Sequence, residues 1–156
     1  MSALPAMATV TNAPPARAIR RILLATDLTA ASAGATDQAF ELARDLRANL
    51  LVVSVIDVES GARSGQRLPR MDQRRAAREE AAQALVVRGR RQGVSVSFLV
   101  WEGEPGPAIV DAAASEQVDL AIVGTHGRGA VGRLLIGSVS EFVVRNAPCP
   151  VLVVRH

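Results

Sequence analysis

Five short apolar runs divide this chain, and most are nearly continuous in Val, Leu and Ile instead of alternating with polar residues. Continuous runs of this length are typical of strands buried on both faces, as in a parallel sheet. We therefore predict strands at residues 22–26, 50–56, 94–101, 120–123 and 151–154.

Helical segments separate these runs. Apolar positions recur at helical spacing after Thr29, which is a plausible N-cap, and Gly93 suits the end of the next helix. Proline at 105 and 107 suits the first turn of another. The predicted helices occupy about residues 29–48, 69–91, 105–116 and 138–145. The alternation of strand and helix predicts an α/β layered fold with right-handed crossovers.

Two strand ends are the first places to look for a ligand site. In sheets of this kind, ligands bind at the carboxyl ends of the strands where the strand order reverses. The first and fourth predicted strands end at Asp27 and Gly124. These residues are therefore candidates before any motif is considered.

Length and composition fit one globular domain. The chain has 156 residues, of which 49% are hydrophobic and 21% charged. Residues 1–18 lack the basic and apolar regions of a signal peptide, and no apolar run approaches the roughly 18 residues that span a membrane. We expect a flexible tail at 1–18, a domain at 19–156, a cytoplasmic location and no membrane partner.

The charge pattern gives little support for a nucleic-acid partner. The net charge is +3, and the basic residues are all arginines, many of them between Arg63 and Arg91. No aromatic residues are interleaved with them to stack on bases. A solvated helical face is the preferred interpretation.

A glycine-rich connection at residues 124–138 is the main functional signal. It joins a predicted strand to a predicted helix, where backbone N–H groups and the helix N-terminus can bind phosphate. It is not a P-loop, because the chain contains no lysine. Gly127, Gly129 and Gly132 have dinucleotide-fingerprint spacing, but they do not lie directly between a strand end and a helix start.

Several of these residues have structural alternatives. Ser138 and Glu141 fit a capping box, which would satisfy the helix N-terminus without a ligand. Asp27 could be a turn residue before the first helix. Arg128 could reach phosphate or lie on the surface, and His126 is better interpreted as a polar loop residue than as a base.

Three segments of the sequence form a recognisable combination. The first is the frame Gly124-x2-Gly127-x9-Gly137-Ser138. The second is the ending Asn-Ala-Pro-Cys-Pro-Val-Leu-Val-Val at 146–154, and the third is the opening Ile-Leu-Leu-Ala-Thr-Asp at 22–27. Together they resemble the universal stress protein family, in particular its ATP-binding subgroup, and the resemblance extends over about residues 20–155.

This resemblance implies a fold and a set of site residues. The fold is an open five-stranded parallel sheet of order 3-2-1-4-5 with helices on both faces, Rossmann-like or adenine nucleotide alpha hydrolase-like. By resemblance, residues at the first strand end lie near ribose and adenine, Val55 contacts adenine through its backbone, and the glycine frame and the following serines hold ribose and phosphates. The implied site residues are Ala25, Thr26, Asp27, Val55, Val123, Gly124, Gly127, Arg128, Gly137, Ser138, Val139 and Ser140.

The resemblance also implies a function. We expect an ATP-binding module with Mg²⁺ or Mn²⁺ beside the phosphates, acting on an unknown protein partner in a stress response. No catalytic residue is predicted, so hydrolysis should be slow at most. The rivals are a genuine ATPase or nucleotidyl-transferring enzyme and a nucleotide-free interaction protein. The apolar segment Val151–Val154 predicts an exposed edge strand and, as in relatives, a homodimer.

Overall fold

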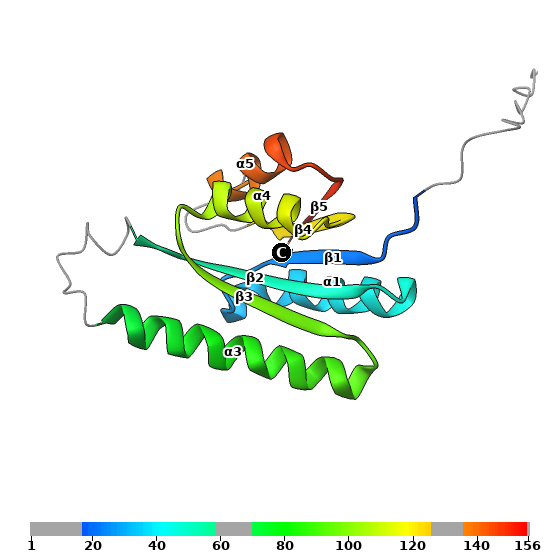
Figure 1. Ribbon diagram of the computed structural model, residues 1–156, viewed down its shortest axis with the longest axis horizontal. Helices are drawn as coiled ribbons and strands as arrows, with labels where there is room; N and C mark the ends of the chain where they lie inside the picture. Colours follow the sequence, from blue (N-terminus) through cyan, green and yellow to red (C-terminus); the bar gives the residue numbers. More distant parts are fainter. Residues whose placement is uncertain (1–16, 59–69, 126–135, 156) are drawn as a thin grey trace, which may run out of the picture.

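The computed structural model describes residues 17–58, 70–125 and 136–155 (Figure 1). Two of the predicted site residues, Gly127 and Arg128, lie outside this description, as does the predicted tail up to residue 16. Within the described residues, no helix is long and apolar enough to cross a membrane.

A five-stranded parallel sheet forms the centre of the molecule. Its strands are β1 (Arg21–Ala25), β2 (Asn49–Asp57), β3 (Val96–Gly103), β4 (Leu120–Gly124) and β5 (Val151–Val154). The order is β3-β2-β1-β4-β5, and every neighbouring pair is parallel. The expected sheet and its order are confirmed.

Helices cover both faces of the sheet. They are α1 (Ala33–Leu46), preceded by the short 3-10 helix η1 (Ala30–Ser32), then α3 (Arg70–Gln92), α4 (Pro105–Ser115) and α5 (Ser138–Asn146). Figure 1 shows α1 and α3 on one side of the sheet and α4 and α5 on the other. This arrangement is the doubly covered layer structure that continuous apolar strands require.

Alternate residues of each strand supply two separate cores. On the α1 and α3 side, Leu24, Val52 and Ile122 pack around Phe40. On the α4 and α5 side, other strand residues pack around Ile109 and Val143. The central strands are therefore apolar on both faces because both faces are covered.

Two α-helix or strand starts differ from the sequence prediction by more than one residue, those of α1 and β3. The first helix begins with η1 instead of an α-turn, and the Thr29 side chain does not cap it. Its hydroxyl donates instead to Asp27 Oδ1 at 2.7 Å. The third strand is shifted two residues toward the C-terminus, because Val94 N donates to Gly89 O at 2.9 Å and closes the end of α3.

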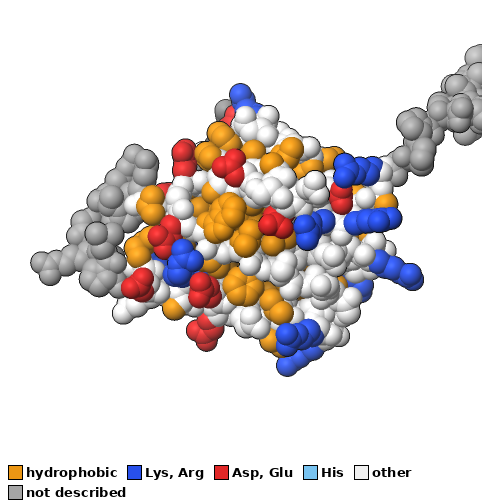
Figure 2. Space-filling model, in the orientation of Figure 1, with side chains coloured by type: hydrophobic (Ala, Val, Ile, Leu, Met, Phe, Trp, Pro, Cys, Tyr) orange, Lys and Arg blue, Asp and Glu red, His pale blue; other side chains and the backbone are white. Residues whose placement is uncertain are grey.

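Charged side chains are unevenly distributed over the surface. On the face drawn in Figure 2, arginines gather at the end where β1 begins, and acidic side chains are more numerous toward the opposite end. That opposite end carries the carboxyl ends of the strands.

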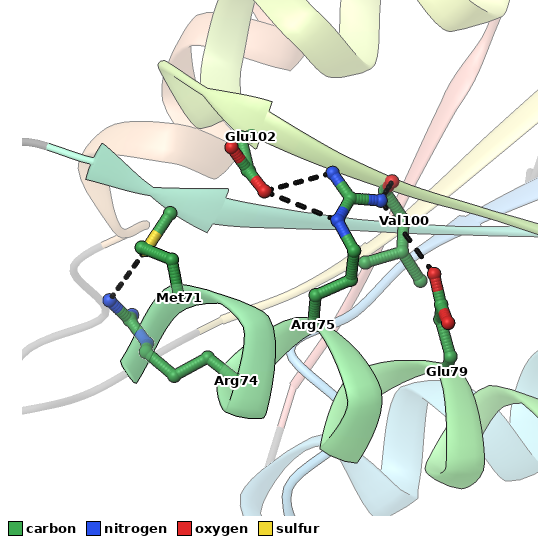
Figure 3. Close-up of polar contacts among 6 residues, drawn as sticks. All are labelled: Met71, Arg74, Arg75, Glu79, Val100 and Glu102. Carbon is green, nitrogen blue, oxygen red and sulfur yellow. Dashed lines mark hydrogen bonds and ion pairs between the residues drawn. The ribbon is translucent and has the colours of Figure 1, made fainter. Parts of the chain in front are cut away.

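An arginine covers part of the exposed edge of β3. Leu50 N bonds to Ser95 O, so the alternation of a parallel ladder turns the backbone groups of Val100 away from β2. Arg75 Nη1 donates to this outward carbonyl at 2.9 Å, and Arg75 Nη2 contacts Glu102 Oε1 at 3.0 Å (Figure 3). The edge is therefore occupied by a side chain of α3.

Candidate functional site

The carboxyl ends of β1 and β4 lie side by side. Leu24 of β1 pairs with Ile122 of β4, and the chain then leaves β1 toward α1. Beyond β4, the next described helix is α5, on the opposite face of the sheet. The two chains therefore diverge here, at the reversal of strand order that the sequence predicts as the ligand site.

The loop after β1 is held by a network of local hydrogen bonds. Thr26 is buried, and its N–H extends the sheet by donating to Val53 O at 3.1 Å. Its hydroxyl accepts from Leu28 N at 3.0 Å, and Leu28 has a left-handed backbone with φ of 62°. A non-glycine residue is uncommon in this region, so the surrounding bonds must hold the loop in place.

Asp27 organises the start of the first helix. Its Oδ1 accepts from Thr29 N at 3.0 Å, Thr29 Oγ1 at 2.7 Å and Ser32 Oγ at 2.6 Å. The turn role considered from the sequence is therefore present. The same bonds fix the orientation of the carboxylate at the end of β1, which is what a preformed ligand contact requires.

Val55 offers backbone groups on the side where β1 ends. Asn49 N bonds to Arg20 O, so alternate residues of β2 from Asn49 onward direct their N–H and C=O toward β1. Val53 uses its carbonyl for Thr26, the last such bond to β1 in the described chain. Val55, two residues further, therefore directs its backbone groups past the end of β1.

The first turn of α5 forms the other wall of the site. Ser140 is buried, and its hydroxyl donates to Gly124 O at 2.7 Å, which ties this turn to the end of β4. Thr125 N continues the sheet by donating to Val154 O at 2.9 Å. The Ser140 hydroxyl hydrogen is used in the bond to Gly124 O. The donor that Ser140 could offer to a phosphate is therefore its backbone N–H.

The capping box considered from the sequence as an alternative to phosphate binding does not form. The N-cap of α5 is Gly137, with extended backbone at φ −60° and ψ 159°, and no side chain of the described residues caps the helix. Ser138 is the first helical residue and is exposed, while Glu141 pairs with Arg145 at 2.8 Å. Among the described residues, no side-chain cap satisfies the first backbone N–H groups of this helix, so they can bind solvent or a ligand.

One charged residue near the site was not predicted. Arg78 of α3 is half-buried, and its Nη1 donates to Ser54 Oγ at 2.6 Å. Burial lowers the pKa of the Arg78 guanidinium, the Asp27 carboxylate opposes this shift, and Arg74 adds to it. The sequence signal was the single polar residue, Ser54, in the otherwise apolar stretch of β2.

The described residues hold no cluster of three or more His, Cys, Asp or Glu side chains that could bind a metal ion. Across that part of the chain, the site consists instead of backbone donors, hydroxyls and the Asp27 carboxylate, which acts electrostatically on the Arg78 guanidinium. Such a set suits a ligand with phosphates and hydroxyls.

Comparison with known proteins identifies the family of this chain. The model of the universal stress protein family matches residues 18–155. The chain belongs to the universal stress protein family. The match covers every described strand and helix, and with them both walls of the site.

Relatives in this family match over most of their length or over a short segment. Universal stress protein MJ0531 of Methanocaldococcus jannaschii is 30% identical over 141 residues, which cover 87% of this chain and 82% of that protein. A putative universal stress protein of Staphylococcus haemolyticus is 35% identical over 139 residues, covering 87% and 84%. One from Thermus aquaticus is 54% identical over 57 residues, covering 36% of this chain and 42% of its own.

Solved structures share the fold. Protein MJ0577 of Methanocaldococcus jannaschii superposes with a TM-score of 0.75 at 23% identity, covering 89% of this chain and 97% of its own. UspA from Lactobacillus plantarum gives 0.69 at 26% identity, covering 88% and 98%. A universal stress protein from Archaeoglobus fulgidus, solved in complex with dAMP, gives 0.63 at 22% identity, covering 87% and 98%.

Proposed function

We propose that this protein is a cytoplasmic, ATP-binding universal stress protein that acts as a nucleotide-dependent binding module in a stress response. The observation that carries the proposal is the first turn of α5, which no described side chain caps and which Ser140 ties to the end of β4 at the reversal of strand order. Relatives solved with cAMP and with dAMP support an adenine nucleotide as the ligand class.

Each wall of the site has a proposed part in binding. The N–H groups of Ser138, Val139 and Ser140 hold the phosphates, aided by the helix dipole and by the Ser138 hydroxyl. Ala25, Thr26 and Asp27 lie against ribose and adenine, and the Val55 backbone contacts adenine. Gly137 and the glycine frame with Val123, Gly124, Gly127 and Arg128 surround the ribose and phosphates.

A divalent cation, Mg²⁺ or Mn²⁺, would accompany the nucleotide. Asp27 Oδ1 already accepts three hydrogen bonds, so that oxygen is poorly suited to replace water on a small cation. We therefore propose that the phosphates hold the ion, with the protein contributing through water. Its bound charge would offset the phosphates that the helix N-terminus receives.

We propose that binding of ATP, and not its turnover, changes the state of the protein, and that any hydrolysis is slow. Asp27 Oδ1 is occupied by Thr29 and Ser32, and Ser140 by Gly124, so these groups are engaged in holding the loop and the helix. A turnover assay on the purified protein checks this statement. A kcat well above about 1 s⁻¹ would make the protein an enzyme.

Calorimetry with a glycine variant tests the nucleotide site. Gly137 has backbone angles that any residue can adopt, so Gly137→Val should fold while its branched side chain obstructs the phosphates. We expect ATP binding by the native protein and none by the variant. Ala114→Val, on an exposed position of α4 toward the opposite end of the sheet, is the control and should bind normally.

The result has two informative alternatives. If the native protein binds no ATP at millimolar concentration and releases no nucleotide on denaturation, it is a nucleotide-free interaction module. If Gly137→Val binds ATP as well as the native protein, the first turn of α5 is not the phosphate site.

We also propose a homodimer that forms through β5 (Val151–Val154). Within the described residues, β5 pairs with β4 on one side only, whereas Arg75 occupies part of the β3 edge. Ala121 N bonds to Pro150 O and Thr125 N to Val154 O, so the backbone groups of Val151 and Val153 face outward. Pairing with a second copy would satisfy them.

A further inference from the structure

The polar pair of Arg78 and Ser54 lies beside the candidate site on the face that α1 and α3 cover. Ser54 is fully buried, and its hydroxyl accepts from the Arg78 guanidinium at 2.6 Å. A buried hydroxyl in a strand needs a partner, but it does not need a charged one. The cost of partly desolvating an arginine here suggests that its charge has a use.

Asp27 stands next to this pair. Thr26 N donates to Val53 O, so the chain leaves β1 beside Ser54, and Asp27 is the next residue. The Asp27 carboxylate bonds to Ser32 at the start of α1, on the same face of the sheet as α3. The Asp27 carboxylate also acts on the Arg78 guanidinium electrostatically, opposing the effect of burial on the pKa of Arg78.

We propose that Arg78 is a positioning residue of the nucleotide site, whose positive charge offsets that of Asp27 so that the site can hold a nucleotide with its polyphosphate. This inference rests on the proposed function. On the face drawn in Figure 2, acidic side chains are numerous toward the carboxyl ends of the strands. Without the positive charge of Arg78, the Asp27 carboxylate at the end of β1 would add more strongly to the repulsion of an anionic ligand.

Arg78 should affect the choice between ATP and adenosine more than it affects the affinity for both ligands. With the Arg78 charge nearby, Asp27 accepts adenosine and ATP alike, whereas loss of this charge strengthens the repulsion of ATP and leaves neutral adenosine little affected. Arg78 would then determine that the site takes adenine nucleotides with phosphates instead of the nucleoside. A residue that only stabilised α3 would affect both ligands equally.

Calorimetric titration of the full chain with ATP and with adenosine tests this distinction. We expect Arg78→Gln to weaken ATP binding by about tenfold and adenosine binding by less than about threefold. The difference should shrink at 1 M salt, where the screening length falls to about 3 Å. Arg90→Gln removes the same charge from an exposed position about 18 Å further along α3, and it should change neither affinity.

A second variant tests whether Arg78 acts through Asp27. Asp27→Asn keeps an oxygen that can accept from Thr29 and Ser32 but removes the charge. In the double variant Asp27→Asn, Arg78→Gln the pair is again neutral. We expect the ratio of ATP to adenosine affinity to return to within about twofold of the native value, as coupled charges predict.

The outcomes separate this inference from the proposed function. Native ATP binding together with a selective loss in Arg78→Gln and recovery in the double variant supports it. Native ATP binding with equal losses for both ligands, with no loss, or with no recovery overturns it and leaves the proposed function standing. If the native protein binds no adenine nucleotide, both are wrong.

Discussion

Asp119 fastens the amino end of β1 through two main-chain bonds. Its Oδ2 accepts from Arg20 N at 2.9 Å and from Arg21 N at 3.0 Å, and its Oδ1 lies 3.5 Å from Arg17 Nε. The Arg20 N–H lowers the carboxyl pKa most, the Arg21 N–H and nearby arginines add to it, and desolvation opposes them. The ionised form is therefore the one that stabilises the fold.

The lowered pKa of Asp119 determines how the stability of the fold depends on pH. A carboxyl with a lowered pKa contributes stability above its unfolded value of about 3.9 and loses it as the pH falls through its folded value. We expect Asp119→Asn to be less stable at pH 7 and to lose less further stability below about pH 4. Urea unfolding at pH 7 and pH 3 checks this. Parallel loss in both proteins would contradict it.

Single residues were the hardest feature to predict from the sequence. The position of Asp27 at the end of β1 could be predicted because it follows an apolar run. Its hydrogen bonds to Thr29 and Ser32 could not, because they depend on a 3-10 turn that residue spacing did not indicate. Arg78 could not be chosen among many arginines, because only tertiary packing brings it to Ser54. The capping-box alternative was wrong because it requires Ser138 to be the N-cap, whereas α5 begins at Ser138 and its N-cap is Gly137.

Two helix glycines differ in their surroundings, since Gly89 packs against the start of β3 and Gly34 is exposed. An added Cβ at Gly89 of α3 would lie 2.6 Å from Val94 O and would overlap Val96, whereas nothing lies within 4 Å at Gly34 of α1. Alanine usually stabilises a helix over glycine by up to about 1 kcal/mol. We expect Gly34→Ala to be neutral or stabilising and Gly89→Ala to cost about 1–3 kcal/mol by overpacking. Thermal unfolding compares the two, and equal shifts would contradict the close packing of α3 on β3.

The covered edge of β3 gives a second prediction at this scale. Arg75→Ala removes the bond to the outward Val100 carbonyl and the contact with Glu102 (Figure 3). We expect a loss of about 1 kcal/mol and increased self-association, because the edge is then open to another strand. Arg74→Ala, from the neighbouring position where the guanidinium donates to the Met71 sulfur at 3.8 Å, is the control in sedimentation and urea experiments. Equal stability and equal self-association of the two variants would show that Arg75 does not prevent other strands from pairing with β3.

Elements and their order were largely predictable from the sequence. Continuous apolar runs indicated strands covered on both faces, and the parallel sheet confirms this interpretation. The strand order was implied by family resemblance, because alternation alone does not fix which strands are neighbours. Element boundaries differ from the predicted ones where a local hydrogen bond forms that the hydrophobic pattern does not indicate. At Val94, the N–H bonds to the end of α3, so β3 does not start there.

The whole molecule has two unlike edges, and this difference decides how copies should associate. The β3 edge carries the Arg75 contact on the Val100 carbonyl, whereas β5 turns the N–H and C=O of Val151 and Val153 outward. An assembly through β5 alone is closed, since the β5 edge of one copy pairs with the same edge of a second copy. We therefore expect a dimer and no longer chain of molecules.

A proline in β5 tests this assembly without breaking the sheet. Val153 directs its N–H away from β4, so Val153→Pro removes a donor from the edge and none from the β4 ladder. We expect the native protein to be a dimer by light scattering at micromolar concentration and the variant to be a monomer with an unchanged circular dichroism spectrum. Leu152→Pro removes an inward donor and should instead destabilise the fold, because Leu152 pairs with Ile122. A native monomer, or a Val153→Pro dimer, would show that β5 is not the contact between copies.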